Sequence, residues 1–244
     1  MTWHWTATAD LAECTRLIGG ADAERRGIAS AHYAVGRDFA EGVDQYVSLD
    51  DRSWHAGRNQ TLRYDGHAFS CDDDKGARTS IGIETVHLGY ARDGVPVGSD
   101  GVVADTVDGG RRLRMAPWGD EQIEMMVAVG RDVIARWPHI GPRDHHGHHD
   151  LCPGYKVDVA GFPFARVLSG IYDRPVADVW SSTWTVQGRR FALRRLGFSV
   201  ASMDGFWTRL DDLALRRFQH RVGLPANGFF TTAVAWALYD VYRT

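Results

Sequence analysis

The most informative stretch of this 244-residue chain runs from Gly147 to Asp158 and reads GHHDLCPGYKVD. It places two histidines and two aspartates around a Pro-Gly turn, so their side chains share one loop. A catalytic zinc site needs three nitrogen, oxygen or sulfur ligands from the protein and leaves one position open for water. A histidine-rich loop can also be an ordinary solvated surface, so composition alone leaves both interpretations open.

Outside this loop, the composition is that of an ordinary globular protein, with length for one large domain or two small ones. The net charge of −3 argues against a dedicated nucleic-acid-binding protein, and we expect no nucleic-acid partner. Residues 180–244 nevertheless hold nine Arg and four Asp with no Lys or Glu, a net charge near +5 that leaves about −8 for the rest. A basic C-terminal region is typical of proteins with an anionic partner, such as a cell-wall polymer carrying peptide carboxylates.

The cysteines and the N-terminus bear on the compartment. Cys14, Cys71 and Cys152 are odd in number and widely spaced, which is not the pattern of a disulfide framework. The opening MTWHWTATADL has no basic segment followed by an apolar one, and no apolar run approaches the about 20 residues of a membrane span. We expect synthesis in the cytoplasm without a signal peptide, no membrane insertion, and action on the cell wall (periplasm) after release or specialised export.

Residue periodicity predicts an α/β N-terminal part followed by a helical C-terminal part. Strands are expected at Met1–Thr6, His32–Val35, Val43–Leu49 and Ser80–Leu88, and helices after Asp10, at Asp120–Trp137 and near Pro163–Ile171. Tyr90–Met115 is expected to form an inserted loop or hairpin, and Gln187–Leu196, Arg209–Val222 and Thr231–Tyr242 are expected to be helices. The predicted domains are residues 1–172 and 184–244, joined by a linker at 173–183.

Four segments resemble, in the same order, the type 2 N-acetylmuramoyl-L-alanine amidases, a fold family that includes AmpD-like enzymes, peptidoglycan recognition proteins and phage amidases. The first, His4–Ala7, is similar to the family's H-H-T-A run, while Trp54–Gly57 matches W-H-A-G and Ser80–Glu84 matches S-I-G-I-E. The loop quoted above is similar to G-H-x-D-I-x-P-G-x-K-x-D-P-G, departing at Leu151 and at the trailing Val159-Ala160. The resemblance implies a mixed central sheet flanked by helices across the N-terminal domain.

It also implies a role for each of five residues. His4, His148 and Asp158 would hold Zn²⁺, Glu84 would act as the base on the attacking water, and Lys156 would stabilise the oxyanion. The residues themselves support this, because Glu84 is a carboxylate on the polar face of a strand and Lys156 lies within a His/Asp cluster. Amide hydrolysis needs a strong nucleophile, and zinc can lower the pKa of bound water to about 7.

Four further residues are predicted to bind substrate. Trp54 and His55 are expected to line the groove against the muramyl sugar or the stem peptide, although an aromatic side chain in such a loop is also a common packing residue. Lys75 and Arg78 are expected to offer a cation to a stem-peptide carboxylate, although the local sequence departs from that of the relatives.

The remaining histidines of the loop and its cysteine are not predicted to be ligands. His145, His146 and His149 are interpreted as supporting or solvent-exposed groups. Relatives with a cysteine ligand carry it at the position of Asp158, so Cys152 is left out of the ligand set.

The C-terminal region resembles a three-helix peptidoglycan-binding domain. The similarity rests on Leu193–Phe198, Asp204–Phe206, Phe218-Gln219 and Gly223-Leu224, and the glycine expected after the D-G-x-F run is replaced, with Trp207 and Thr208 following Phe206. It implies peptidoglycan as the partner, and tethering to an insoluble polymer raises the local concentration of cleavable bonds. A domain that merely caps the catalytic one is the alternative.

The function expected from these features is zinc-dependent hydrolysis of the amide bond between N-acetylmuramic acid and L-alanine in peptidoglycan, by a monomer. A non-catalytic peptidoglycan recognition protein and a zinc peptidase acting within the stem peptide stay open as alternatives. The residues also leave open whether the protein is a phage endolysin or a bacterial amidase.

Overall fold

The computed structural model describes residues 1–19, 29–57, 62–64, 67–69, 75–91, 101–154 and 156–243. The strands there are β1 (Thr2–Trp5), β2 (Tyr33–Val35), β3 (Val43–Gln45), β4 (Leu62–Tyr64), β5 (His67–Phe69), β6 (Gly82–Thr85), β7 (Val102–Asp105), β8 (Arg112–Met115) and β9 (His146–Gly147). The helices there are α1 (Leu11–Ile18), α3 (Lys75–Thr79), α4 (Asp120–Arg136), α5 (His148–Leu151), α6 (Phe164–Ile171), α7 (Val186–Arg195), α8 (Arg209–Arg221) and α9 (Thr232–Arg243), with 3₁₀ turns η2 (Pro142–Asp144) and η3 (Ser181–Thr183).

The central sheet has the strand order β3-β2-β6-β1-β9. Strands β2, β6, β1 and β9 run parallel to one another, and β3 is antiparallel to β2, which confirms the predicted mixed sheet and its hairpin. The N-terminal strand β1 is interior, because the Thr2 amide donates to Ile81 O at 2.8 Å and the His146 amide donates to Met1 O at 3.1 Å. A short strand at the start of the chain is therefore held on both sides.

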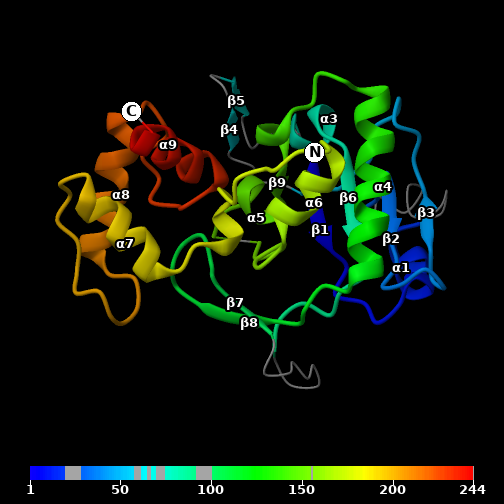
Figure 1. The fold of residues 1–244 in the computed structure, drawn as a ribbon, viewed down its shortest axis with the longest axis horizontal. Coiled ribbons are helices and arrows are strands. Elements are labelled where there is room, and N and C mark those ends of the chain that lie inside the picture. The colour runs from blue at the N-terminus through cyan, green and yellow to red at the C-terminus, as the bar shows by residue number, and fades with distance from the viewer. Residues whose placement is uncertain are drawn as a thin grey trace.

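Helices cover the two faces of this sheet, with α4 along one face in Figure 1. Trp3 and Ile83 point into the core that α4 and α6 share with the sheet. Helices α4 and α6 cross closely, since a Cβ at Gly130 would overlap the Ile171 side chain. On the other face α1 begins where the Asp10 side chain accepts from the Glu13 amide, as its N-cap position predicts, and packs Leu11 against the sheet.

The insertion forms the β7–β8 hairpin, which Figure 1 shows running towards the C-terminal helices. The fully buried Arg189 of α7 donates to Thr106 O at 2.8 Å and to Asp105 O at 2.9 Å at the turn of this hairpin. The Phe230 amide donates to Val107 O at 2.7 Å. Residues of the C-terminal part donate hydrogen bonds to backbone carbonyls of the hairpin. The insertion therefore connects the N-terminal part of the chain with the C-terminal helices.

The three predicted C-terminal helices, α7, α8 and α9, lie side by side at one end of the molecule (Figure 1). Inside them Arg190 pairs with Asp211 at 2.8 Å, with both side chains fully buried. Arg190 also donates to Asp204 O at 2.6 Å, so it holds the loop between α7 and α8. Trp207, which follows Phe206 where the family's glycine is replaced, packs against Gly109 of the β7–β8 turn.

The segment at residues 173–183, expected to be a linker, contains a fully buried tryptophan. Trp180 stacks on Phe164 of α6 with ring centroids 5.2 Å apart and meets Trp236 of α9 edge-on at 5.3 Å. One continuous hydrophobic core thus extends from the sheet to the C-terminal helices. The domain boundaries stay a prediction. Within the part of the chain that the structure describes, every helix is too short or too polar to cross a membrane.

Candidate metal centre and active site

The candidate site lies on the face of the sheet opposite α4. Strands β1 and β6 pair in parallel with His4 beside Glu84, and Ala34 of β2 continues this row. Side chains alternate between the two faces of a strand, so His4 and Glu84 point away from the core that holds Trp3 and Ile83. The sheet register therefore brings together two residues that are far apart in sequence.

The loop from β9 to Asp158 supplies the other two predicted ligands. Helix α5 places His148 at its start, and the His149 amide donates to Asp158 O at 2.5 Å. Between them Gly154 has a φ of +77°, in the left-handed region that a glycine adopts without strain. The Pro-Gly turn thus returns the chain so that Asp158 lies next to His148.

His4, His148 and Asp158 converge on one point, as the sequence analysis predicts. The Nδ1 atoms of His4 and His148 are 3.0 Å apart, and Asp158 Oδ2 lies 3.0 Å from His148 Nδ1 and 3.4 Å from His4 Nδ1. A tetrahedral zinc site with bonds of 2.0–2.1 Å has ligand-to-ligand distances of about 3.3 Å. These three buried residues therefore fit a metal ion in their donor types and in their spacing.

The second nitrogen of each histidine is held by another group. His148 Nε2 lies 3.3 Å from Ala56 O, and His4 Nε2 lies 3.1 Å from His55 Nδ1. Hydrogen bonds of this kind fix the ring orientation and tautomer of a metal-binding histidine. Both rings consequently present Nδ1 to the centre.

The His55 ring contacts the His4 ring edge-on, and His55 is only 4% exposed. Its Nε2 lies 3.1 Å from Ser80 O, and its ring occupies space that a Cβ at Gly82 would overlap. The glycine in the S-I-G-I-E segment therefore makes room for this imidazole. The position of His55 favours a role in orienting His4 over the predicted contact with substrate.

Burial and the neighbouring side chains together set the charges of His4 and Asp158. Burial lowers the pKa of His4 to about 4, with the neighbouring His148 acting in the same direction. The pKa of Asp158 lies well below its usual value, because the charge and hydrogen bonds of His148 and His4 outweigh the desolvation of the carboxylate. At neutral pH His4 is neutral and Asp158 is ionised, which are the protonation states that bind a metal.

Glu84 and Lys156 flank this group. Glu84 Oε1 is 3.9 Å from His4 Nδ1, and Glu84 Oε2 is buried with no hydrogen-bond partner among the residues that the structure describes. Burial, followed by the charge of Asp158, raises the pKa of Glu84 to about 8. The Lys156 charge opposes that rise and also lowers the pKa of His4, so it acts at both residues. A carboxyl with this pKa can exchange protons near neutral pH.

Trp54 is 48% exposed, beside the buried His55. The Arg52 guanidinium lies 3.7 Å from the centroid of its ring, a cation–π arrangement. An exposed aromatic ring held in this way can stack on a sugar or peptide, and the predicted substrate contact of Trp54 stays a prediction.

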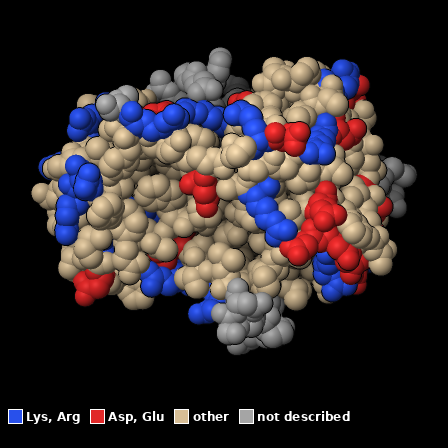
Figure 2. Space-filling model, viewed as in Figure 1, with Lys and Arg blue, Asp and Glu red and all other residues tan. Residues whose placement is uncertain are grey.

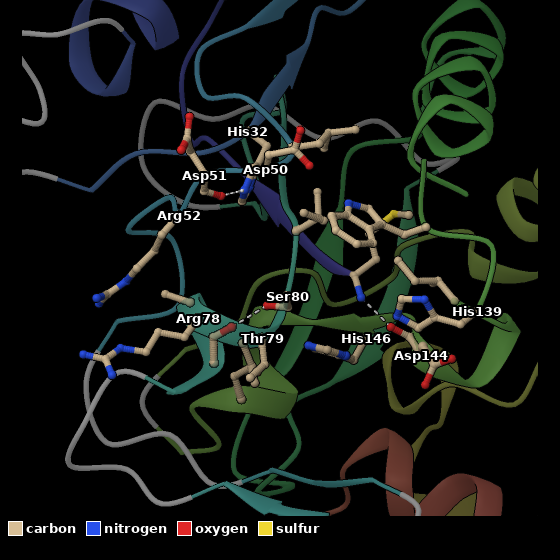
Figure 3. A pocket seen from close by; sticks show the side chains of 18 residues that line it. His32, Asp50, Asp51, Arg52, Arg78, Thr79, Ser80, His139, Asp144 and His146 are labelled. Carbon is tan, nitrogen blue, oxygen red and sulfur yellow. Dashed lines mark hydrogen bonds between the residues drawn. The ribbon is translucent and has the colours of Figure 1, made fainter. Parts of the chain in front are cut away.

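The structure places Arg78 in the lining of a cavity of about 740 Å³ at the amino ends of the parallel strands. Figure 3 shows Arg52 and Arg78 extending to the same side of this cavity, with Ser80 and His146 between them and Asp144. None of the three converging residues lines this cavity, and the predicted substrate contact of Arg78 stays a prediction. The side chain of Lys75, the other predicted cation, lies outside the described residues.

The spare histidines of the loop are all buried, so none is a solvent-exposed group. His146 Nε2 lies 2.8 Å from Thr2 Oγ1, His145 Nε2 lies 2.8 Å from the Tyr172 hydroxyl, and His149 Nε2 lies 2.9 Å from Ser181 Oγ. Their hydrogen bonds support the loop, which is the first of the two roles considered for them in the sequence analysis.

Sequence reasoning missed the role of Asp150. Its carboxylate is fully buried and bonded to residues far along the chain, Ser181 and Thr232 among them. The sequence did contain a signal, because Asp150 is the aspartate of the G-H-x-D run. Its hydrogen-bond partners lie far along the chain, so the sequence could not identify them.

Comparison with known proteins identifies the family and the fold. The family model described as N-acetylmuramoyl-L-alanine amidase matches residues 1–158. The 1,6-anhydro-N-acetylmuramyl-L-alanine amidase AmpD of Enterobacter cloacae is 32% identical over 132 residues, which cover 52% of this chain and 52% of that protein. The chain therefore spans about half the length of this curated relative.

Two solved structures share the fold over nearly the whole chain. The N-acetylmuramyl-L-alanine amidase AmiD from E. coli, in complex with anhydro-N-acetylmuramic acid-L-Ala-D-γ-Glu-L-Lys, has a TM-score of 0.53 at 22% identity, covering 99% of this chain and 88% of that one. AmpDh3 from Pseudomonas aeruginosa, in complex with anhydromuramic pentapeptide, has a TM-score of 0.53 at 22% identity, covering 99% and 91%. At this identity the likeness establishes the fold.

Proposed function

This chain belongs to the N-acetylmuramoyl-L-alanine amidase family, and from that membership we propose that it is a zinc-dependent peptidoglycan amidase. The bond cleaved is the amide between N-acetylmuramic acid and the L-alanine of the stem peptide. The observation that carries the proposal is the convergence of His4, His148 and Asp158 within 4.8 Å, with Glu84 adjacent to them. The bound muramyl peptides named for the E. coli and P. aeruginosa proteins supply the substrate class to test.

His4, His148 and Asp158 would hold the metal, two through imidazole nitrogen and one through carboxylate oxygen. Zinc bound there supplies a water of lowered pKa and polarises the scissile carbonyl. Two histidines and a carboxylate form a donor set typical of catalytic zinc, which leaves a position open to reactants.

Glu84 is the group that moves the proton. Its carboxylate lies beside the ligands, and its Oε2 has no hydrogen-bond partner among the described residues, so in the ionised form it can take a proton from the attacking water and pass it to the departing amine nitrogen. The C–N bond then breaks, leaving a carboxylate on the muramic acid and a free amino terminus on the peptide. Lys156 offers a cation to the oxygen that becomes negative during attack.

We propose that the C-terminal helices bind the cell wall. Figure 2 shows basic side chains prevailing over these helices and acidic ones gathering at the opposite end of this face. Phe206, in the loop before α8, is 75% exposed, and Phe191 of α7 is also exposed. Aromatic and basic groups together suit a glycan that carries peptide carboxylates. The protein would then act as a monomer on the wall, in the periplasm.

The test is product analysis with a defined substrate. Anhydro-N-acetylmuramic acid-L-Ala-D-γ-Glu-L-Lys incubated with the zinc-loaded protein should yield the free sugar and the intact tripeptide by mass spectrometry. Peptides cut within the stem would indicate a peptidase instead, and binding without cleavage would indicate a recognition protein. Glu84→Gln is the control, since it should retain zinc and lose turnover.

A further inference from the structure

Asp150 is a fully buried carboxylate that accepts hydrogen bonds on both oxygens. The Gly147 amide donates to Oδ2 at 2.9 Å, and the Ser181 hydroxyl donates to Oδ1 at 2.8 Å. Thr232 donates twice, from its amide to Oδ1 at 2.7 Å and from its hydroxyl to Oδ2 at 2.9 Å. A buried carboxylate is stable only when it is bonded in this way, so its position follows that of its donors.

Two of these donors come from the first turn of α9. The amide at the start of a helix has no partner within the helix, and the positive end of the helix dipole favours a carboxylate there. Thr232 Oγ1 lies 3.1 Å from Ser181 Oγ, so η3 and α9 hold Asp150 together. Trp180, next to Ser181, is packed between α6 and α9, which keeps this group of donors in place.

The position of Asp150 affects the positions of the candidate metal ligands His148 and Asp158. Asp150 lies in the same helical turn as His148, and its bond to the Gly147 amide closes the turn that His148 begins. The neighbouring His149 amide donates to Asp158 O. A shift of Asp150 therefore moves both ligands that this loop supplies, and the metal geometry with them.

We propose that Thr232 is a positioning residue for the metal centre, which makes the first turn of α9 part of the catalytic apparatus. The inference rests on the proposed function, since it concerns the same His4, His148 and Asp158 group. The C-terminal helices are then more than a wall anchor, because the catalytic loop depends on them for its geometry. Truncation before α9 would leave Asp150 buried without two of its donors.

The experiment measures metal binding by the full chain, independently of turnover. Wild type, Thr232→Val and Thr232→Ser are stripped of metal, and their Zn²⁺ affinity is measured by competition with a chromophoric chelator. Loss of a hydrogen bond that supports a metal ligand weakens affinity about 10-fold or more, so Thr232→Val should bind Zn²⁺ about 10-fold more weakly. Thr232→Ser keeps both donors and should restore the affinity.

Thr231→Val is the matched control, because Thr231 is also buried but does not donate to Asp150. Its Zn²⁺ affinity should equal that of wild type. The visible absorption of bound Co²⁺, which reports ligand geometry, should change in Thr232→Val alone. The value of kcat should fall in that variant with KM unchanged, since Thr232 acts through Asp150 on the loop that carries the metal ligands.

Wild-type affinity and an unchanged Co²⁺ spectrum in folded Thr232→Val would overturn the inference and leave the proposed function intact. If Thr232→Val does not fold, Ser181→Ala removes another donor to Asp150, and an unchanged affinity in that variant overturns the inference equally. Failure of wild type to bind Zn²⁺ would refute the proposed function and the inference with it.

Discussion

Replacing Glu84 with glutamine should abolish turnover and, at neutral pH, stabilise the metal-free protein. The Glu84 side chain is only 15% exposed, its Oε2 is buried with no hydrogen-bond partner among the described residues, and its pKa is raised to about 8. An ionised carboxylate there loses its hydration without regaining hydrogen bonds, whereas a neutral amide of the same shape carries no charge to desolvate. Without its proton-transfer group the enzyme should lose about 10²–10⁴-fold in kcat.

The size of the stabilisation follows from the pKa. A carboxyl group whose pKa rises from 4.5 to about 8 on folding keeps a proton that the unfolded chain has released. The free energy of unfolding therefore falls by about 1.4 kcal/mol for each pH unit between those two values, and is unaffected by this group at lower pH. At pH 7 the penalty reaches about 3 kcal/mol, and Glu84→Gln removes it, which corresponds to a rise in Tm of roughly 6–12 °C.

The assay is urea and thermal unfolding of both proteins in chelator, from pH 4.5 to pH 8. The difference in unfolding free energy should grow with pH and vanish near pH 4.5. Glu124→Gln, on the exposed side of α4, is the control and should change stability by less than about 0.5 kcal/mol. A Glu84→Gln protein no more stable than wild type at pH 7.5, or a difference independent of pH, would refute the desolvation of this carboxylate.

Chelation should abolish amide hydrolysis and Zn²⁺ should restore it; hydrolysis that persists after exhaustive metal removal would defeat the metal requirement. His55→Ala removes the hydrogen bond to His4 Nε2 and should weaken Zn²⁺ binding about 10–100-fold in a competition assay, while unchanged binding would mean that other contacts hold the His4 ring. Asp211→Ala leaves the buried Arg190 without its ion-pair partner and should lower the free energy of unfolding in urea by about 3–5 kcal/mol. Asp212→Ala, at the more exposed neighbouring position, should cost less than about 1 kcal/mol, and equal losses in the two variants would contradict the importance of burial.

The sequence by itself determined the features that depend on near neighbours. The Pro-Gly turn that returns Asp158 to His148, the N-cap at Asp10 and the three C-terminal helices all lie where local pattern predicts them. Each depends on side-chain periodicity, capping or turn chemistry within a few residues. The resemblance to the amidase family, now supported by the match over residues 1–158, brought His4 and Glu84 into the same predicted site.

Only the tertiary structure showed which residues from distant parts of the sequence contact the site residues. It placed His55 against the His4 ring, placed Arg78 at a cavity that none of the three converging residues lines, and joined Asp150 to Thr232. These contacts follow from strand order and from the docking of α9 against the ligand loop, and local periodicity carries no information about either. A buried carboxylate or imidazole must find hydrogen-bond partners wherever the fold supplies them, and here the fold supplied them from segments far away in the chain.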